Sequence, residues 1–330
     1  MTSGVESLPR PAAVTATWLA SEPKLSRLMD GVEQRMAELA GGHGPVLSRH
    51  ASATIAAGGK RLRPLLVCLA AGVPPPECEG LIRAAVAVEL IHAATLVHDD
   101  VLDGALTRRG RSTVVALAGR GVATATGDLL FARAFAELAA GGSAESVRIL
   151  SRATSELARG ELMQRADAFK PDLDVDRYLE RCRLKTATLF RASCELGALE
   201  GGADVGALGA FGERIGLAFQ ILDDVLDVSG PPERTGKPQG SDLLDGTVTL
   251  PLLLARPHDA ELAATDLRGV RTADDALAIC TRISETGALE AAKQHALALV
   301  DDAKQLLPPL PDRQQAALEL AAAGVVERYA

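Results

Sequence analysis

Apolar residues recur at three- and four-residue steps along most of this chain, and this spacing restricts its fold more than any other feature. Residues spaced in this way share one face of an α-helix. The first such run consists of Leu25, Leu28, Val32, Met36 and Leu39. Hydrophobic residues make up 47% of the chain but aromatic residues only 3%. This composition favours close-packed helices over a β-sandwich or a barrel.

Similar helical patterns continue to the end of the chain, and Gly or Pro residues separate them. No alternating strand pattern of useful length is present. We therefore predict one all-α domain over residues 21–330, preceded by a loose tail at 1–20. After the first helix, which starts near residue 21, the predicted helices are 46–57, 62–71, 77–100, 112–118, 121–140, 143–169, 175–200, 203–229, 241–255, 272–281, 285–306 and 312–328.

The charge balance and the cysteines restrict the classes of partner. A net charge of −8 and a pI near 5.4 argue against a nucleic-acid surface. The five cysteines form no C-x-x-C pair and no signal peptide is recognisable, so we expect reduced thiols and a cytoplasmic location. No uncharged apolar run reaches about 18 residues, so we expect no membrane span, and a peripheral contact with a bilayer is left open.

The acidic pentapeptide Asp-Asp-Val-Leu-Asp occurs twice, at residues 99–103 and 223–227. In a helix, the first and last Asp of each copy lie one turn apart on the same face. Both copies lie in apolar helices, where carboxylates need a cation or become protonated. A solvated acidic face would explain a single copy equally well. Two identical copies favour a site for Mg²⁺, which prefers oxygen ligands and substrate phosphates.

Cationic and polar residues lie near both acidic copies. Each has a simpler explanation when it is taken alone, such as a charged helix start, a loop that neutralises the carboxylates, or a structural histidine. Together they predict a site for a diphosphate, which arginine and lysine bind well. These residues are Lys60 and Arg63 behind a glycine pair, His92, Arg108 and Arg109 after the first copy, Lys185 and Thr186, Gln220 before the second copy, and Lys237 in a long loop.

Together, these motifs resemble the trans-isoprenyl diphosphate synthases, the polyprenyl synthetase family. The likeness covers roughly residues 25–328. The matching motifs, in chain order, are Gly59-Lys60-Arg61-x-Arg63-Pro64, His92 to Asp103 with Arg108-Arg109-Gly110, Gly160-Glu161, Lys185-Thr186-Ala187, Phe219-Gln220-Ile221-x-Asp223-Asp224-x-x-Asp227, Gly236-Lys237-Pro238-x-Gly240-x-Asp242-Leu243 and Thr249-Leu250-Pro251.

The resemblance implies an all-α bundle around a deep central cavity, of the isoprenoid synthase type, and a homodimer. It also implies two substrates, isopentenyl diphosphate and an allylic prenyl diphosphate. The residues implied to bind isopentenyl diphosphate are Lys60, Arg63, His92 and Arg109. Those implied to hold up to three Mg²⁺ ions on the allylic diphosphate are Asp99, Asp103 and Asp223, with Asp227 acting less directly. Those implied to contact the allylic diphosphate itself are Arg108, Lys185 and Lys237. Those implied to lie beside the allylic cation are Thr186 and Gln220.

The implied reaction agrees with the chemistry of these residues. Magnesium and cationic side chains stabilise the departing pyrophosphate, so the carbon–oxygen bond ionises to an allylic carbocation. The isopentenyl double bond attacks this cation in a head-to-tail 1'-4 condensation, and a proton is then lost. No covalent enzyme intermediate is required.

The residues before the first acidic copy bear on product length. In the family, bulky side chains four and five positions before Asp99 close the cavity, whereas Thr95 and Ala94 are small. We therefore predict an all-trans polyprenyl diphosphate of twenty carbons or more, with geranylgeranyl diphosphate as the close alternative. Candidates for a deeper floor are Leu130, Phe131, Ala134 and Phe135.

Two other classes of protein share parts of this pattern. A terpene cyclase also ionises a prenyl diphosphate at an aspartate-rich site, but its second metal motif is usually of another type and it needs no isopentenyl site. A non-catalytic subunit of a heteromeric synthase tends to lose its acidic motifs, and both copies are intact here. These observations favour the synthase.

Overall fold

The computed structural model describes residues 22–59, 61–108, 110–231 and 238–327. The predicted tail at 1–20 lies outside these residues. The helices are α2 (Pro23–Ala40), α3 (Pro45–Ala56), α4 (Leu62–Ala71), α5 (Glu79–Asp103), α6 (Val114–Ala140), α7 (Ala144–Asp167), α8 (Val175–Cys182), α9 (Thr188–Gly201), α10 (Val205–Ser229), α12 (Ser241–Leu244), α13 (Leu250–Ala255), α14 (Ala260–Ala264), α15 (Ala273–Glu285), α16 (Ala288–Gln305) and α17 (Asp312–Glu327). The other elements are the π-helical turn η1 (Arg183–Ala187), the 3₁₀ turns η2 (Arg256–His258) and η3 (Leu267–Gly269), and the strands β1 (Thr107–Arg108) and β2 (Arg111–Ser112).

Local signals in the sequence begin many of these helices. Proline occupies the first turn of α2 and of α3, where its missing N–H would have no partner within the helix. The side chains of Thr113, Ser143 and Asp204 accept hydrogen bonds from backbone N–H groups in the first turns of α6, α7 and α10. Such caps satisfy amide groups that a helix leaves unpaired at its start.

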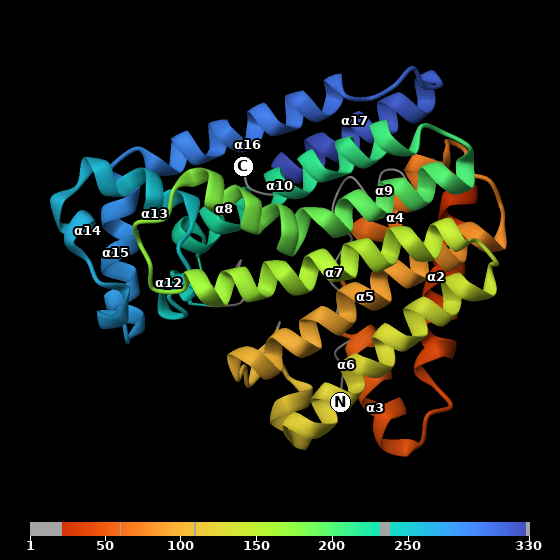
Figure 1. The fold of residues 1–330 in the computed structure, drawn as a ribbon, viewed down its shortest axis with the longest axis horizontal. Coiled ribbons are helices and arrows are strands. Elements are labelled where there is room, and N and C mark those ends of the chain that lie inside the picture. The colour runs from red at the N-terminus through yellow and green to blue at the C-terminus, as the bar shows by residue number, and fades with distance from the viewer. Residues whose placement is uncertain (1–21, 60, 109, 232–237, 328–330) are drawn as a thin grey trace, which may run out of the picture.

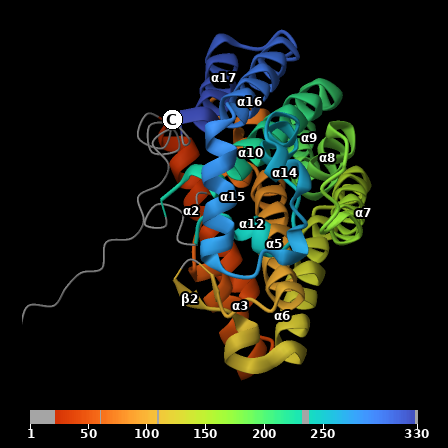
Figure 2. The same cartoon turned by 90° about the vertical axis from the view of Figure 1, so that its left-hand side faces the viewer.

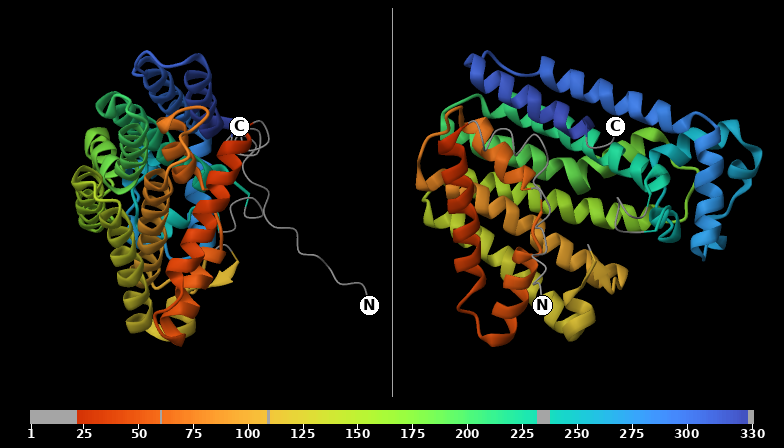
Figure 3. Two further views of the ribbon diagram at one scale, coloured as in Figure 1. Left: turned by 90° about the vertical axis from the view of Figure 1, so that its right-hand side faces the viewer. Right: turned by 180° about the vertical axis from the view of Figure 1, so that it is seen from behind.

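The long helices lie side by side in a bundle (Figure 1). Viewed along its long axis, α5 lies near the middle, with α2 on one side and α7 and α8 on the other (Figure 2). Helices α16 and α17 cover α10, whereas α6 packs along α5 at the opposite face. Seen from behind, α2 and α15 run across the long helices near opposite ends (Figure 3).

Small residues let these helices approach closely. Helix α9 packs on α4 through two glycines. A Cβ added to Gly197 would lie 2.1 Å from the Val67 carbonyl oxygen, and a Cβ added to Gly201 would lie 2.2 Å from the Ala71 carbonyl oxygen. No larger residue fits there without a shift of the backbone. The abundance of Ala and Gly therefore reflects close packing between helices, as the composition predicts.

The fold confirms the predicted all-α class and changes several boundaries. Helices 112–118 and 121–140 merge into α6, which is kinked at Gly119 because this residue has φ of 79° and ψ of 169°. The predicted helix 175–200 is divided by η1, and 241–255 is interrupted between α12 and α13. A strand pair was not predicted, yet β1 and β2 form a two-residue antiparallel hairpin around Gly110.

Three helices, α5, α6 and α10, are long and apolar enough to cross a membrane when only length and composition are considered. More than half of the apolar window is buried in α5 (61%) and in α10 (56%), but only 28% is buried in α6. Although α6 packs along α5, much of its apolar surface is therefore left uncovered within the described part of the chain. The expected absence of a membrane span stays a prediction.

All five cysteines are free thiols, as expected, and four of them are buried.

Candidate active site

The two acidic motifs lie in the last turns of α5 and α10, and both helices end on the same side of the bundle (Figure 1). Helix α5 stops after Asp103 because Gly104 adopts a left-handed conformation with φ of 64°. Asp99 and Asp103 therefore share one helix face, as predicted. The structure places the first carboxylate partly inside the bundle and leaves the second exposed.

Asp99 lies in an electrostatically mixed environment. Burial raises the pKa of this carboxyl to about 6, while Lys185 and Arg108 act to lower it and Glu161 and Asp103 act to raise it. The burial effect exceeds the attraction of the two cations. The site would therefore gain stability from a further positive charge beside Asp99.

The middle residue of the first motif has a separate task. Asp100 is buried, and its Oδ1 accepts a hydrogen bond of 2.7 Å from Nε of Arg108. This contact anchors β1 to the end of α5. Arg108, which the resemblance assigns to the allylic diphosphate, is thus held beside the first motif with a side chain that is still 37% exposed.

An ion-pair relay on α7 connects the first acidic motif to Lys185. The Asp103 carboxylate accepts from Nη2 of Arg165 at 2.8 Å, and Nε of Arg165 donates to Glu161 at 2.9 Å. The other oxygen of Glu161 accepts from Nζ of Lys185 at 2.5 Å. Sequence reasoning matched Glu161 to a family motif without giving it a role, and it missed Arg165. Their i, i+4 spacing on one helix was the available signal.

Lys185 and Thr186 lie within the π-helical turn η1, between α7 and α10. The Thr186 hydroxyl donates to Oε1 of Gln220 at 2.6 Å, so the structure brings together two residues that the resemblance assigned to the surroundings of the allylic cation. Nε2 of Gln220 in turn donates to Oδ1 of Asp224 at 2.8 Å. Helix α10 thereby fixes which atom of Gln220 faces Thr186.

Asp224, the middle residue of the second motif, forms a buried polar contact that the sequence analysis did not predict. The Tyr178 hydroxyl donates to its Oδ2 at 2.7 Å. Burial raises the pKa of Asp224 to about 7, and the hydrogen bonds from Tyr178 and Gln220 oppose this increase. The two adjacent aspartates of the second motif therefore have different surroundings, because Asp223 is only half-buried while Asp224 points into the core.

Asp227 ends the second motif and anchors the chain that follows it. Its carboxylate accepts from the Ser241 hydroxyl at 2.7 Å and from the backbone N–H of Asp242 at 3.2 Å. These contacts hold the start of α12 against α10. They are consistent with the expectation that Asp227 acts less directly on a metal than Asp223.

Within the described ranges, no group of three or more His, Cys, Asp or Glu residues is placed to hold a metal ion by itself. The predicted ligands belong to two separate helix ends. This arrangement still fits magnesium, which keeps several waters and takes one or two carboxylates together with substrate phosphate oxygens. The all-oxygen donor set and the uncompensated charge of Asp99 both suit a hard cation.

The remaining predicted cations are only partly described. Lys60, Arg109 and Lys237 lie outside the described residues. The Arg63 guanidinium carbon lies 4.6 Å from the centre of the Phe190 ring, and His92 is half-buried on α5. Arg61, to which no role was assigned, pairs with Glu33 and with the buried Glu89 and so holds the glycine loop to α2 and α5.

The predicted chain-length residues lie along α5 beside α6. Ala94 is fully buried and Thr95 is half-buried, with its hydroxyl bonded to the His92 carbonyl at 2.8 Å. On α6, Leu130 and Ala134 are buried in the core, while the Phe131 ring stacks on His98 at a centroid distance of 5.5 Å. Of the candidates for a deeper floor, Phe131 and Phe135 are the two that are incompletely buried.

Comparison with known proteins identifies the family of this chain. The polyprenyl synthetase family model matches residues 44–277. Component 2 of heptaprenyl diphosphate synthase from Geobacillus stearothermophilus is 43% identical over 273 residues, which are 82% of this chain and 85% of that protein. The crystal structure of a polyprenyl synthase from Caulobacter crescentus, complexed with calcium and isoprenyl diphosphate, is 36% identical. It superimposes with a TM-score of 0.87 and covers 98% of this chain and 100% of that one. A decaprenyl diphosphate synthase from Rhodobacter capsulatus has a TM-score of 0.86 at 35% identity, with 93% of this chain and 97% of that chain covered.

The fold and the site thus define an all-α isoprenoid synthase. The chain belongs to the polyprenyl synthetase family and is a prenyltransferase of the trans-polyprenyl type.

Proposed function

We propose that this protein is an all-trans polyprenyl diphosphate synthase that condenses isopentenyl diphosphate with an allylic diphosphate. The observation that carries the proposal is the convergence of Asp99, Lys185 and Glu161 in one electrostatic group beside the Thr186–Gln220 pair. A carboxylate, a cation and oriented dipoles are what ionisation of a prenyl diphosphate requires. The similarity to named polyprenyl synthases supports the same reaction.

We propose that Asp99, Asp103 and Asp223 hold up to three magnesium ions, with Asp227 supporting them. When bound, magnesium would supply the positive charge that neutralises the departing pyrophosphate. The support is the oxygen-only donor set, the raised pKa of Asp99, and a relative whose crystal structure contains calcium with isoprenyl diphosphate.

The chain's own side chains divide the remaining work. Lys185 would exchange Glu161 for a diphosphate oxygen, because both are anions and the Nζ group, while bonded to Glu161, also acts electrostatically on Asp99. Arg108 and Lys237 would bind the same diphosphate. The oxygens of Thr186 and Gln220 would face the allylic cation and stabilise it through their dipoles.

Isopentenyl diphosphate would be bound by the second basic group, Lys60, Arg63, His92 and Arg109. Two of these residues, Arg63 and His92, lie on neighbouring helices that pack against each other, α4 and α5. Their support as a binding group is the match to the family motifs, because Lys60 and Arg109 lie outside the described residues.

The reaction is tested by measuring pyrophosphate release with purified protein, Mg²⁺ and farnesyl diphosphate, with and without isopentenyl diphosphate. We expect release only when both substrates are present. Release from the allylic substrate alone would indicate a terpene cyclase. No release would indicate a subunit that needs a second component. Two relatives are named component 2 of heptaprenyl diphosphate synthase, so this outcome is the alternative to test.

Product length is the second expected result. We propose a product of twenty carbons or more, because Ala94 and Thr95 leave no bulky side chain beneath the first motif. Labelled isopentenyl diphosphate and chromatography of the dephosphorylated products measure the length. The variant Ala94→Phe is expected to give a shorter main product than the wild type. A wild-type product that stops at fifteen carbons would contradict the proposal.

We also propose that the protein acts as a homodimer through α6. An apolar helix with only 28% of its window buried suits burial against a second copy. Its outer side presents small residues such as Ala132. Sedimentation equilibrium should give twice the chain mass. Ala132→Arg should weaken the dimer, whereas Ala158→Arg, which changes another exposed alanine, on α7, should not. A monomeric wild type would overturn this proposal.

A cytoplasmic location, with at most a peripheral membrane contact, is part of the same proposal. Its support is the set of five unpaired thiols, which suits a reducing compartment.

A further inference from the structure

The π-helical turn η1 is an unusual segment in an otherwise regular bundle. It joins α8 to α9, and the backbone N–H of Thr188 bonds to the Arg183 carbonyl five residues earlier. A π turn inserts one extra residue into a helix, and such turns are rare and frequently lie at functional sites. Here the turn contains Lys185 and Thr186, which the proposed function assigns to the allylic diphosphate and the cation.

Two glycines, one on α7 and one on α10, lie directly against the backbone of this turn. An added Cβ on Gly160 of α7 would lie 2.5 Å from the Lys185 backbone nitrogen, and one on Gly216 of α10 would lie 2.5 Å from the Ala187 Cα. The backbone of η1 is thus confined between α7 and α10. This close packing fixes how deeply η1 lies in the bundle, but it does not fix the two ends of the turn, Arg183 and Thr188.

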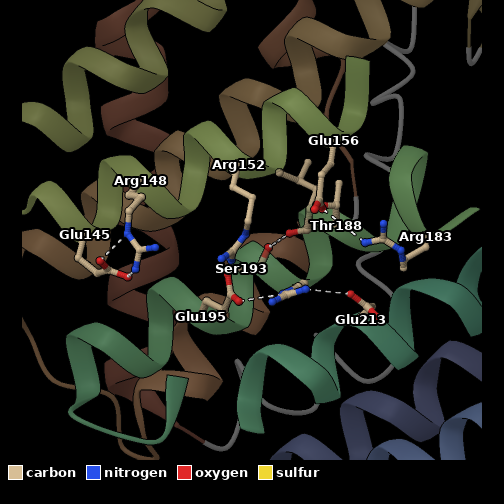
Figure 4. A network of polar contacts seen from close by, with 11 residues as sticks. Glu145, Arg148, Arg152, Glu156, Arg183, Thr188, Ser193, Glu195 and Glu213 are labelled. Carbon is tan, nitrogen blue, oxygen red and sulfur yellow. Dashed lines mark hydrogen bonds and ion pairs between the residues drawn. The ribbon is translucent and has the colours of Figure 1, made fainter. Parts of the chain in front are cut away.

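A single carboxylate on α7 contacts both ends of the turn (Figure 4). Glu156 of α7 accepts a hydrogen bond of 2.5 Å from the hydroxyl of Thr188, the first residue after η1. The same oxygen, Oε2, lies 3.7 Å from Nη1 of Arg183, the first residue of η1. The Thr188 side chain is buried and that of Glu156 is 16% exposed, so both contacts are largely shielded from water.

Arg183 has a second anchor that completes the arrangement. Its Nε and Nη2 atoms donate to the two oxygens of Glu180 at 2.7 and 2.9 Å. Glu180 precedes η1 on α8, so it fixes the Arg183 side chain locally. Only Glu156 connects both ends of the turn to a different helix, within the contacts described for these residues.

We propose that Glu156 is a positioning residue, which ties the two ends of the π turn to α7 and thereby aims Lys185 and Thr186 into the active site. The inference rests on the proposed roles of Lys185 and Thr186. Without the contacts of Glu156, the π turn is free to relax toward a regular α-helix. Loss of the one extra residue of the turn would rotate the side chains near it by about 100° around the helix axis, which is the angle between successive residues. A misplacement of about 1 Å at a reacting group lowers turnover by about a hundredfold.

The test uses two variants that remove the tie by different means. Glu156→Gln removes the charge and keeps the shape of the side chain, and Thr188→Val removes only the hydroxyl. Each should lower kcat by about tenfold or more, while KM for isopentenyl diphosphate stays within about twofold because its proposed binding residues lie on other elements. The double variant should be no worse than the more impaired single variant, since both act on one contact.

Glu213→Gln is the matched control. Glu213 belongs to the same network, is 17% exposed, and accepts from Arg191 at 3.3 Å. Among the described residues it has no hydrogen bond or ion pair with η1 or Thr188, and it acts on Arg183 only through a longer-range attraction. We expect its kcat to stay within about twofold of the wild type. Equal losses in the control and in Glu156→Gln, or unchanged kcat in both tie variants, would overturn the proposal.

Hydrogen exchange separates this inference from the proposed reaction. Amides 183–188 should exchange faster in Glu156→Gln than in the wild type and in Glu213→Gln, whether or not the protein condenses the substrates. Unchanged exchange there would refute the positioning role. A wild type that fails to condense the substrates would refute the proposed function instead, and the exchange result would still decide the role of Glu156.

Discussion

Asp99→Ala is expected to lower turnover by about a thousandfold or more while the protein remains folded. A metal that stabilises the leaving pyrophosphate contributes several kcal/mol, and each 1.4 kcal/mol corresponds to about tenfold in rate. Removing one of its carboxylates therefore has a large effect. Steady-state rates with both substrates and Mg²⁺ measure it, and Mn²⁺ binding in the presence of pyrophosphate measures the loss of the metal directly.

Stability distinguishes this prediction from simple unfolding. Burial raises the pKa of Asp99 to about 6, so the ionised side chain is unfavourable in the metal-free protein. The metal-free Asp99→Ala variant should therefore melt at the wild-type temperature or above it. Asp128→Ala is the control, because this carboxylate near the same helix end is 68% exposed. Turnover of Asp99→Ala within tenfold of the wild type would contradict the metal assignment.

Asp223→Ala should lose turnover to a similar extent, and its neighbour should behave differently. Asp223 is half-buried and is proposed to face the metal, so its removal should lower the melting temperature less than a change at the buried Asp224 does. Asp224→Asn leaves one acceptor oxygen where the buried carboxylate has two, so either the Gln220 N–H or the Tyr178 hydroxyl loses its acceptor. The cost is about 1–3 kcal/mol, which thermal melting would detect.

The pair of variants tests whether the two adjacent aspartates really have different roles. If Asp224→Asn also loses turnover, the loss should come with a lower melting temperature, because Gln220 must rotate and its contact to Thr186 changes. If Asp223→Ala retains turnover, the second half of the proposed metal site is wrong. If Asp223→Ala instead lowers stability as much as Asp224→Asn, the assignment of roles is reversed.

Much of the candidate site was predictable because its signals are local. The spacing of apolar residues predicted the helices, and the chemistry of Asp, Lys and Arg predicted a metal and diphosphate site. The resemblance implied that Thr186 and Gln220 both lie beside the allylic cation, and the structure adds a direct hydrogen bond between them, which was not predicted. Glu161 stood in a recognised motif, but nothing along the chain showed that it bonds to Lys185.

Other features depend on contacts between helices that are distant in sequence. Arg165 joins Asp103 across 62 residues, and Asp224 meets Tyr178 across 46. Neither partner can be read from spacing, because the pairing depends on how α5, α7, α8 and α10 pack. The hairpin β1–β2 was also missed, since two-residue strands leave no alternating pattern to detect.

The sequence by itself determined that this protein is a helical bundle, and it predicted a chemistry based on carboxylates and cations. Period and residue type contain that information, because each acts over one or two helical turns. Only the tertiary structure showed that 175–200 is not a regular α-helix throughout, and that the π-helical turn at Arg183–Ala187 contains Lys185 and Thr186. One extra residue in a turn barely changes the apolar pattern, whereas Gly160, Gly216 and Glu156, which confine that turn, come from two other helices.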